Sequence, residues 1–276
     1  MLAGCPVFPA DNVWNRPVTG LPVAADSATL IDSIGASAHL HPDFGSYAGY
    51  GIPYNAVVAA TTPKYTVAFD YADESDPGPY PIPPSPKIEA GSDQHILILA
   101  RDTCTLYEMW DARRTATGWA AGSGATWSLR SNALRPAGWT SADAAGLPIL
   151  SGLVRYDEVA AGFIGHAIRF TAPKTRRAYI YPARHFASSS TSAALPPMGT
   201  RLRLAASYDI SKLPPQARVI AQAMKTYGII LADNGSPWFF QGASDARFDD
   251  DQLDALKTIP GSAFEVVDTS GWVSGR

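Results

Sequence analysis

Short apolar runs, separated by turns rich in glycine and proline, dominate this chain. The 276 residues include 23 glycines and 23 prolines, which is near one residue in six. Helical periodicity is scarce, and its clearest instances are residues 27–34, 214–227 and 250–257. Many short strands with short irregular connections favour a mainly β fold. We therefore predict a β-sandwich or jelly-roll-like core with two or three short peripheral helices.

The strand predictions rest on apolar runs of two kinds. Residues 95–100 form a continuous apolar run, which is typical of a strand buried on both faces. Residues 103–112 alternate, so Glu108 shares a face with Leu106 and Trp110. The same reasoning predicts strands at 54–60, 65–71, 118–129 (as a hairpin), 166–171, 177–181, 201–205 and 228–233.

Composition and charge exclude several classes of protein. The net charge of −3, without a basic block, argues against binding to nucleic acid. No apolar run approaches the ~20 residues that span a membrane. We find no internal repeat and no linker, so we predict a single β-rich domain over residues 1–276, with the N-terminal arm 1–25 packed on the core. We expect a monomer or a weak homo-oligomer.

Several features favour a secreted protein. Lysines are few, and Cys5 and Cys104 are the only cysteines. In an oxidising compartment they would form a disulfide that joins the N-terminal arm to a central strand. Two buried free thiols are the alternative. The first residues have neither the basic nor the apolar stretch of a signal peptide, so we expect an extracellular protein from which the signal has been removed.

Titratable side chains gather between residues 152 and 186. His166 shares a strand face with apolar residues, which directs it toward a core or the floor of a cleft. Glu158 and Asp157 lie shortly upstream, and His185 follows the next strand. A carboxylate beside an imidazole suits proton transfer. A satisfied core histidine, with first-turn carboxylates paired to arginine, is the structural alternative.

Glu108 is a second candidate, because a carboxylate in an apolar row lies at a cleft or is buried and paired. Tryptophan beside a carboxylate suits sugar chemistry, since indole stacks on a pyranose face and a desolvated acid has a raised pKa. The candidate catalytic residues are Glu108, Glu158, His166, Asp157 and His185. The candidate substrate-binding residues are Trp110, Trp127, Trp139, Tyr156 and Arg184.

Two segments suggest metal ligands, although we expect no required cofactor. His39, His41 and Asp43 could bind zinc or copper if the segment is extended, because alternate side chains then share a face. Four acids between residues 70 and 76 enter a Pro/Gly-rich loop, which could supply oxygen ligands to calcium. A polar loop and a solvated acidic loop are the respective structural alternatives.

Three segments, RYDEVAAGFIGHAIRF, YPARHF and YGIILADNG, carry a resemblance that extends from about Phe8 to Asp268. In these segments the chain resembles a group of secreted bacterial proteins to which we attach no activity. The resemblance implies an extracellular, single-domain protein, and it implies no reaction and no catalytic residue.

These observations favour an extracellular carbohydrate-active enzyme that cleaves a polysaccharide or oligosaccharide. The simplest form is a glycoside hydrolase that uses carboxylates with an assisting histidine. A polysaccharide lyase would use Tyr156 or His166 as the base and Arg184 or His185 to neutralise a uronate. A lectin-like binding protein and a histidine-ligated metalloenzyme are two further hypotheses.

Overall fold

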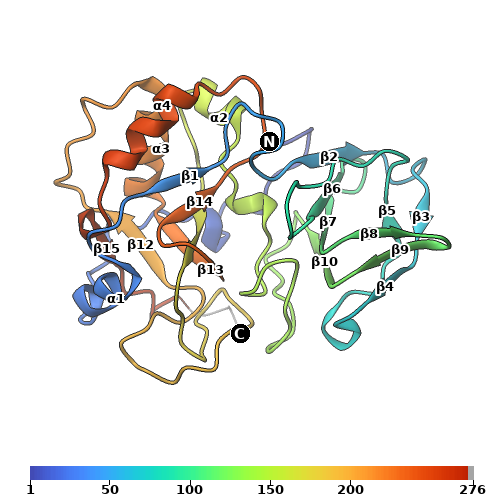
Figure 1. Cartoon of the computed structure of the whole chain (residues 1–276), viewed down its shortest axis with the longest axis horizontal. Helices are drawn as coiled ribbons and strands as arrows, with labels where there is room; N and C mark the ends of the chain where they lie inside the picture. Colours follow the sequence, from blue (N-terminus) through green and yellow to red (C-terminus); the bar gives the residue numbers. More distant parts are fainter. Residues whose placement is uncertain (273–276) are drawn as a thin grey trace.

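The computed structural model describes residues 1–272 and shows a mainly β chain with several sheets and short helices (Figure 1). This confirms the predicted class, a sandwich-like β core with few short helices. The strands are β1 (His41–Asp43), β2 (Tyr54–Val57), β3 (Lys64–Tyr65), β4 (Val67–Phe69), β5 (Tyr80–Pro81), β6 (Ile96–Ala100), β7 (Thr105–Trp110), β8 (Arg113–Thr115), β9 (Gly118–Ala121), β10 (Ser123–Ser128), β11 (Ile168–Ala172), β12 (Arg201–Leu204), β13 (Ile229–Asn234), β14 (Phe239–Gln241) and β15 (Phe264–Val266). The helices are α1 (Ser27–Ile34), α2 (Tyr156–Ala160), α3 (Pro215–Thr226) and α4 (Asp250–Asp254), with 3₁₀ turns η1 (Val13–Asn15), η2 (Ala72–Glu74), η3 (Leu150–Gly152), η4 (Ala255–Thr258) and η5 (Gly261–Ala263).

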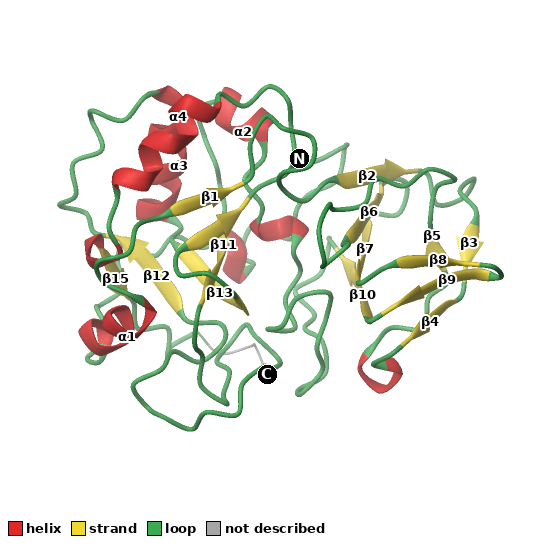
Figure 2. Cartoon of the chain, viewed as in Figure 1, coloured by secondary structure: helices red, strands yellow, loops and turns green. Residues whose placement is uncertain are grey.

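The largest sheet has six strands in the order β1-β14-β11-β13-β12-β15. Strand β11 runs parallel to β13, while β12 pairs antiparallel with both of its neighbours. The other end of the molecule holds a four-stranded sheet (β10-β7-β6-β2), a three-stranded sheet (β4-β9-β8) and the β3-β5 pair. Figure 2 shows the α-helices gathered around the six-stranded sheet and away from the smaller sheets.

Strand β6 lies between two hydrophobic cores. All of its residues are buried. Ile96 and Ile98 contribute to a small core shared with the three-stranded sheet. Leu97 and Leu99 point the other way, into a large core shared with the six-stranded sheet. The prediction that residues 95–100 form a strand buried on both faces is therefore confirmed.

Helix α3 leads the chain into the centre of the six-stranded sheet. It begins at Pro215 and ends before Gly228, as the sequence predicts. Gly228 has φ +73°, and a Cβ atom there would lie 2.2 Å from the carbonyl oxygen of Leu202. Only glycine fits this turn. Strand β13 follows at once and carries Asp233 to its far end.

Two strand predictions are wrong in detail. Residues 118–129 do not form a hairpin, because β9 pairs with β4 and β8 whereas β10 pairs with β7. The break falls at Gly122, where a Cβ atom would lie 2.2 Å from the ring of Trp110, so the chain passes between sheets there. Residues 177–181 form no strand, because this stretch makes only an isolated bridge between Tyr179 and Met198.

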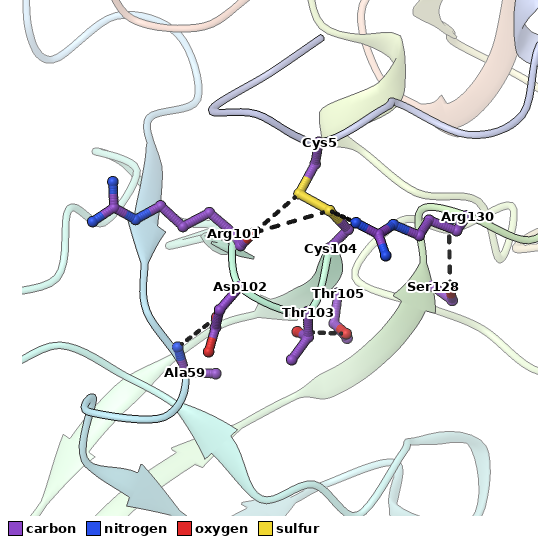
Figure 3. The surroundings of a disulfide bond; sticks show 9 residues. All are labelled: Cys5, Ala59, Arg101, Asp102, Thr103, Cys104, Thr105, Ser128 and Arg130. Carbon is purple, nitrogen blue, oxygen red and sulfur yellow. Dashed lines mark hydrogen bonds between the residues drawn. A yellow bond between two sulfur atoms is a disulfide. The ribbon is translucent and has the colours of Figure 1, made fainter.

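The N-terminal arm packs on the large core, to which it contributes Cys5, Val13 and Trp14. Cys5 forms the predicted disulfide with Cys104 in the turn between β6 and β7 (Figure 3). Within this turn, the carboxylate of Asp102 accepts hydrogen bonds from two backbone N–H groups that follow β2. In residues 1–272, no helix has the length and hydropathy that a membrane span requires.

Candidate active site

A cavity of about 470 Å³ lies where the six-stranded sheet meets the four-stranded sheet. Its walls come from distant parts of the chain, namely the ends of β7 and β13, η2, the residues before β6, and two loops near residues 140–144 and 185–187. The titratable residues that line it are Tyr71, Glu74, Asp93, His95, Asp143, His185 and Asp233.

Asp143 lies in a loop that folds around its own polar groups. Its backbone N–H donates to Ser141 Oγ (2.9 Å), and this hydroxyl donates to the carbonyl of Leu147 (2.7 Å). Gly146 takes φ +68°, where a Cβ atom would lie 2.5 Å from a backbone carbonyl. Its N–H closes the turn on the carbonyl of Asp143 (3.0 Å). The loop therefore fixes the buried Asp143 side chain in the cavity wall.

Arg169, on β11, holds two carboxylates. Its Nε and Nη2 atoms lie 3.2 and 3.1 Å from the same oxygen of Asp143, Oδ2. The same Nη2 atom lies 3.9 Å from Oδ2 of Asp233. Because both Oδ2 atoms lie near the same Nη2 atom, the two carboxylates are close neighbours.

The second oxygen of Asp143 is free. Oδ1 is buried and has no hydrogen-bond partner among residues 1–272. A buried acceptor without a donor costs free energy, and native proteins contain few of them. Asp143 is one of the residues that line the cavity, and its side chain is closed to solvent.

Burial raises the pKa of both carboxylates. Burial and the adjacent charge of Asp143 raise the pKa of Asp233 to about 7, against the opposing effect of Arg169. Burial also raises the pKa of Asp143 and outweighs the ion pair and hydrogen bond with Arg169, which lower it. Neighbouring buried carboxylates of this kind titrate as a coupled pair.

His95 forms a hydrogen bond with the loop that carries Asp143. Its Nε2 atom lies 2.9 Å from the carbonyl oxygen of Ala142, and its Nδ1 atom faces the carboxylate of Glu89. Burial lowers the pKa of His95, but the hydrogen bond and charge of Glu89 outweigh burial and raise it. Nε2 carries a proton in this arrangement, because a carbonyl oxygen can only accept a hydrogen bond.

The mouth of the cavity combines aromatic rings with charged groups. The rings of Tyr71 and Trp110 lie 6.4 Å apart, tilted by 43°. His185 donates from Nδ1 to the carbonyl of Ala144 (2.8 Å), which leaves its Nε2 atom 3.8 Å from Glu74 Oε2. Trp110 and His185 are the predicted site residues that line this cavity.

Glu108 does not line the cavity. It is fully buried, and its two oxygens accept hydrogen bonds from the backbone N–H groups of Ile149 and Leu150, each at 2.8 Å. Burial raises the pKa of Glu108 to about 7, against these two hydrogen bonds. In the structure Glu108 therefore holds the backbone at the start of η3.

Glu158 and His166 meet as predicted, together with Arg155. Glu158 lies 2.6 Å from Arg155 Nη2 and 3.2 Å from His166 Nε2. His166 Nδ1 donates to the carbonyl of Ala167 (2.7 Å). Burial raises the pKa of Glu158, but Arg155 and His166 outweigh burial and lower it to about 2. This cluster stands apart from the residues that line the cavity.

Asp157 and Tyr156, at the start of α2, both contact Arg247. The exposed carboxylate of Asp157 lies 2.8 Å from Arg247 Nη1. The guanidinium of Arg247 also stacks over the ring of Tyr156, at 4.4 Å from its centroid.

Arg184, Trp127 and Trp139 gather around Arg135. Arg184 Nε donates to the carbonyl of Arg135 (2.8 Å). The guanidinium of Arg135 lies 5.6 Å from the ring centroids of both tryptophans. The three predicted binding residues therefore pack around Arg135, beside the loop of residues 140–144.

The predicted zinc or copper ligands lie on and before β1. His41 Nε2 lies 3.1 Å from Tyr50 Oη, and its ring stacks on Phe239 at 4.0 Å. Burial raises the pKa of Asp43, and His39 precedes the strand in an exposed position. Residues 1–272 contain no group of three or more His, Cys, Asp or Glu side chains arranged to hold a metal ion.

The acids of the predicted calcium loop make contacts within the protein. Asp70 lies 3.1 Å from Arg113 Nη2, and Asp76 pairs with Arg135. Glu74 accepts a hydrogen bond of 2.9 Å from a backbone N–H in the loop that carries Asp143. The loop thereby positions η2 beside the cavity.

Asp143 and Asp233 are site residues that the sequence did not predict. Asp143 lies in a short Ala- and Gly-containing loop with no motif around it. Asp233 does carry a signal, because it ends an apolar strand, and ligands of open sheets bind beyond the carboxyl ends of parallel strands.

No match to this chain was found among protein-family models, curated proteins or solved structures.

Proposed function

We propose that this chain is an extracellular carbohydrate-active enzyme that cleaves a polysaccharide, most simply a glycoside hydrolase, with Asp143 and Asp233 as its catalytic carboxylates. The observation that carries the proposal is the pair of carboxylates on Arg169, one with a free oxygen and one with a pKa of about 7, in the wall of one cavity.

Asp233 fits the role of general acid. With a pKa of about 7 it is about half protonated at neutral pH and holds its proton below it, and its side chain is 31% exposed, which allows contact with a glycosidic oxygen. Proton transfer to that oxygen lets the bond to the anomeric carbon break with a neutral leaving group.

Asp143 fits the role of nucleophile or base. Arg169 stabilises its ionised form, and both guanidinium contacts fall on Oδ2, so the Oδ1 lone pairs stay available. In a retaining enzyme the Asp143 carboxylate would attack the anomeric carbon, and in an inverting one it would deprotonate water; either role requires that the bound substrate reach a side chain that is closed to solvent in this structure. Retention requires carboxyl groups ~5–5.5 Å apart, which the contacts with Arg169 permit.

The aromatic mouth supports sugar binding. Trp110 and Tyr71 offer ring faces on which a pyranose stacks. The cavity volume of about 470 Å³ falls within the ~300–1,000 Å³ range of small-molecule sites. The disulfide is compatible with an extracellular protein.

The test is a screen over a panel of glycans that follows reducing ends and ultraviolet absorbance together. A hydrolase releases reducing ends without a new ultraviolet band, and Asp143→Asn and Asp233→Asn abolish that release. Asp157→Asn is the matched control, because Asp157 is exposed and lies outside the cavity.

Three different outcomes would each remove the proposal. A product that absorbs in the ultraviolet identifies a lyase, and glycan binding without turnover identifies a lectin-like protein. Turnover that survives Asp143→Asn would exclude this site.

A further inference from the structure

The charges that face the cavity are unevenly distributed. Four of its lining residues are acids, Glu74, Asp93, Asp143 and Asp233, and no lysine or arginine of residues 1–272 lines it. Asp233 is only partly ionised near neutral pH and Asp143 pairs with Arg169, so the uncompensated negative charge lies on Glu74 and Asp93. A cavity of this kind favours cations and repels carboxylates, because the low-dielectric walls strengthen the field inside it.

The basic groups near the cavity are already engaged. Arg169 has a side chain only 4% exposed and holds Asp143 and Asp233. His95 is enclosed between Glu89 and the carbonyl of Ala142. His185 is the remaining basic lining residue, and its Nε2 atom lies 3.8 Å from Glu74. Arg169 and His95 are therefore not free to neutralise an anionic ligand, and the nearest charged partner of His185 is Glu74.

Acceptors, in contrast, remain available. The buried Oδ1 atom of Asp143 lacks a hydrogen-bond donor among the described residues. Glu74 accepts its backbone hydrogen bond through Oε2, which leaves Oε1 open, and its side chain is 34% exposed. Asp93 is exposed at the rim. A ligand that complements these groups carries N–H donors and positive charge.

The aromatic rings at the mouth favour the same chemistry. Tyr71 and Trp110 line the cavity together with Glu74 and Asp93. An ammonium group near the face of tryptophan or tyrosine gains electrostatic attraction from the ring. Aromatic faces beside carboxylates therefore suit a sugar ring that bears an amine.

We propose that the cavity binds a sugar unit with a protonated amine, a hexosamine whose amino group is not acetylated, and that Glu74 and Asp93 recognise the ammonium group. This substrate class rests on the proposed function as a carbohydrate-cleaving enzyme. Asp143 and Asp233 then carry out the reaction, and Glu74 and Asp93 select the substrate.

Calorimetric titration of the whole protein with matched monosaccharides tests the proposal. The probes are the 2-amino, 2-acetamido, 2-hydroxy and uronate forms of the gluco and galacto sugars, which differ only in the substituent and its charge. We expect an amino sugar to bind about 10-fold more tightly than its uncharged partners, which corresponds to about 1.4 kcal/mol. We also expect this preference to shrink as salt is raised.

Variants locate the recognition. Glu74→Gln and Asp93→Asn should each reduce the preference several-fold, since both keep an acceptor oxygen and lose only charge. Asp254→Asn is the control, because Asp254 is an exposed acid at the end of α4 that pairs with Lys257 and does not line the cavity. An equal effect of Asp254→Asn would show a bulk-charge effect and overturn the assignment.

The proposal fails if an uncharged sugar or a uronate binds as tightly as the amino sugar, or if no amino sugar binds at ~50 mM, near the weak end of specific affinity. These failures are separable from failure of the proposed function. If the protein cleaved a neutral glycan in an Asp143-dependent way, the proposed function would stand and the preference for an amino sugar would be rejected. If it bound an amino sugar but cleaved no glycan, the preference would stand and the proposed function would be rejected.

Discussion

Arg155 and Arg169 each hold buried partners, yet the two clusters differ in what they leave unbound. Around Arg155, Glu158 and His166 have partners for their polar atoms, and the pKa of Glu158 falls to about 2. Around Arg169, one carboxylate oxygen is without a partner among residues 1–272, and the pKa of Asp233 rises to about 7. A dense group of titratable residues therefore indicates a site only when its hydrogen bonding is incomplete and a cavity reaches it.

The strongest test of this comparison is Asp143→Asn. We expect turnover on a cleaved glycan to fall by about 10²–10⁴-fold, because the variant loses the charge that acts at the anomeric carbon. The melting temperature, measured on the same sample, should fall, since Arg169 stays buried and loses its closest charged partner, so turnover is compared at a temperature where the variant is folded. Retention of most of the turnover would remove Asp143 from the mechanism.

Removal of the disulfide separates stability from activity. We expect Cys5→Ser/Cys104→Ser to lower the free energy of unfolding by about 2–4 kcal/mol, because the disulfide closes a chain segment with a sequence separation of 99 residues. Urea unfolding measures this change. Turnover at a temperature where the variant is folded should be unaffected, since neither cysteine lines the cavity. Parallel loss of turnover would couple the N-terminal arm to the site.

Glu158→Gln tests the Arg155 cluster. We expect a loss of about 1–3 kcal/mol in unfolding free energy, because Arg155 stays buried without its carboxylate, while the 28% exposure of Glu158 moderates the cost. Turnover should remain at the wild-type level. A folded variant that lost turnover would reverse the comparison and restore Glu158 and His166 as catalytic residues.

Asp233 gives the smallest and most diagnostic effect. Its pKa of about 7 in the folded state exceeds the ordinary value of 3.8, so the folded state binds more protons between those pH values. Stability therefore falls as pH rises through this window. Asp233→Asn cannot ionise. Because the 31% exposure of the Asp233 side chain reduces the effect of its raised pKa on stability, we expect the variant to exceed the wild type by on the order of 1–2 kcal/mol at pH 8 and to match it at pH 4. Equal melting temperatures at pH 8 would contradict the assigned protonation.

Local pattern predicted much of the secondary structure. Residues 95–100 and 214–227 became β6 and α3 because the apolar period there agrees with the burial that packing imposes. The hairpin expected at 118–129 failed, because the pairing partners of β9 and β10 lie elsewhere in the chain. Strands β1 and β14 were missed, since each has only three residues and exists through pairing with its neighbour.

The site was harder to predict than the fold, because its chemistry depends on contacts between distant residues. Asp143 and Arg169 lie 26 positions apart, and their pairing follows from the loop that Gly146 closes. Alternation correctly placed Glu108 in an apolar row, and the structure shows it buried and paired rather than at a cleft. Tertiary contacts decide whether that row faces backbone donors or a cavity, and periodicity in the sequence does not predict such contacts.

Strand β6 also has a consequence for how a substrate would enter. One of its faces belongs to the large core, which also contains residues of the six-stranded sheet, so the two sheets that flank the cavity are joined through continuous packing. A hinge movement of one sheet against the other would break that packing. Enzymes that close about a hinge have domains that meet at a small interface. The carboxylates are therefore preorganised in the resting protein. A flexible glycan chain would have to adopt a conformation that fits the cavity.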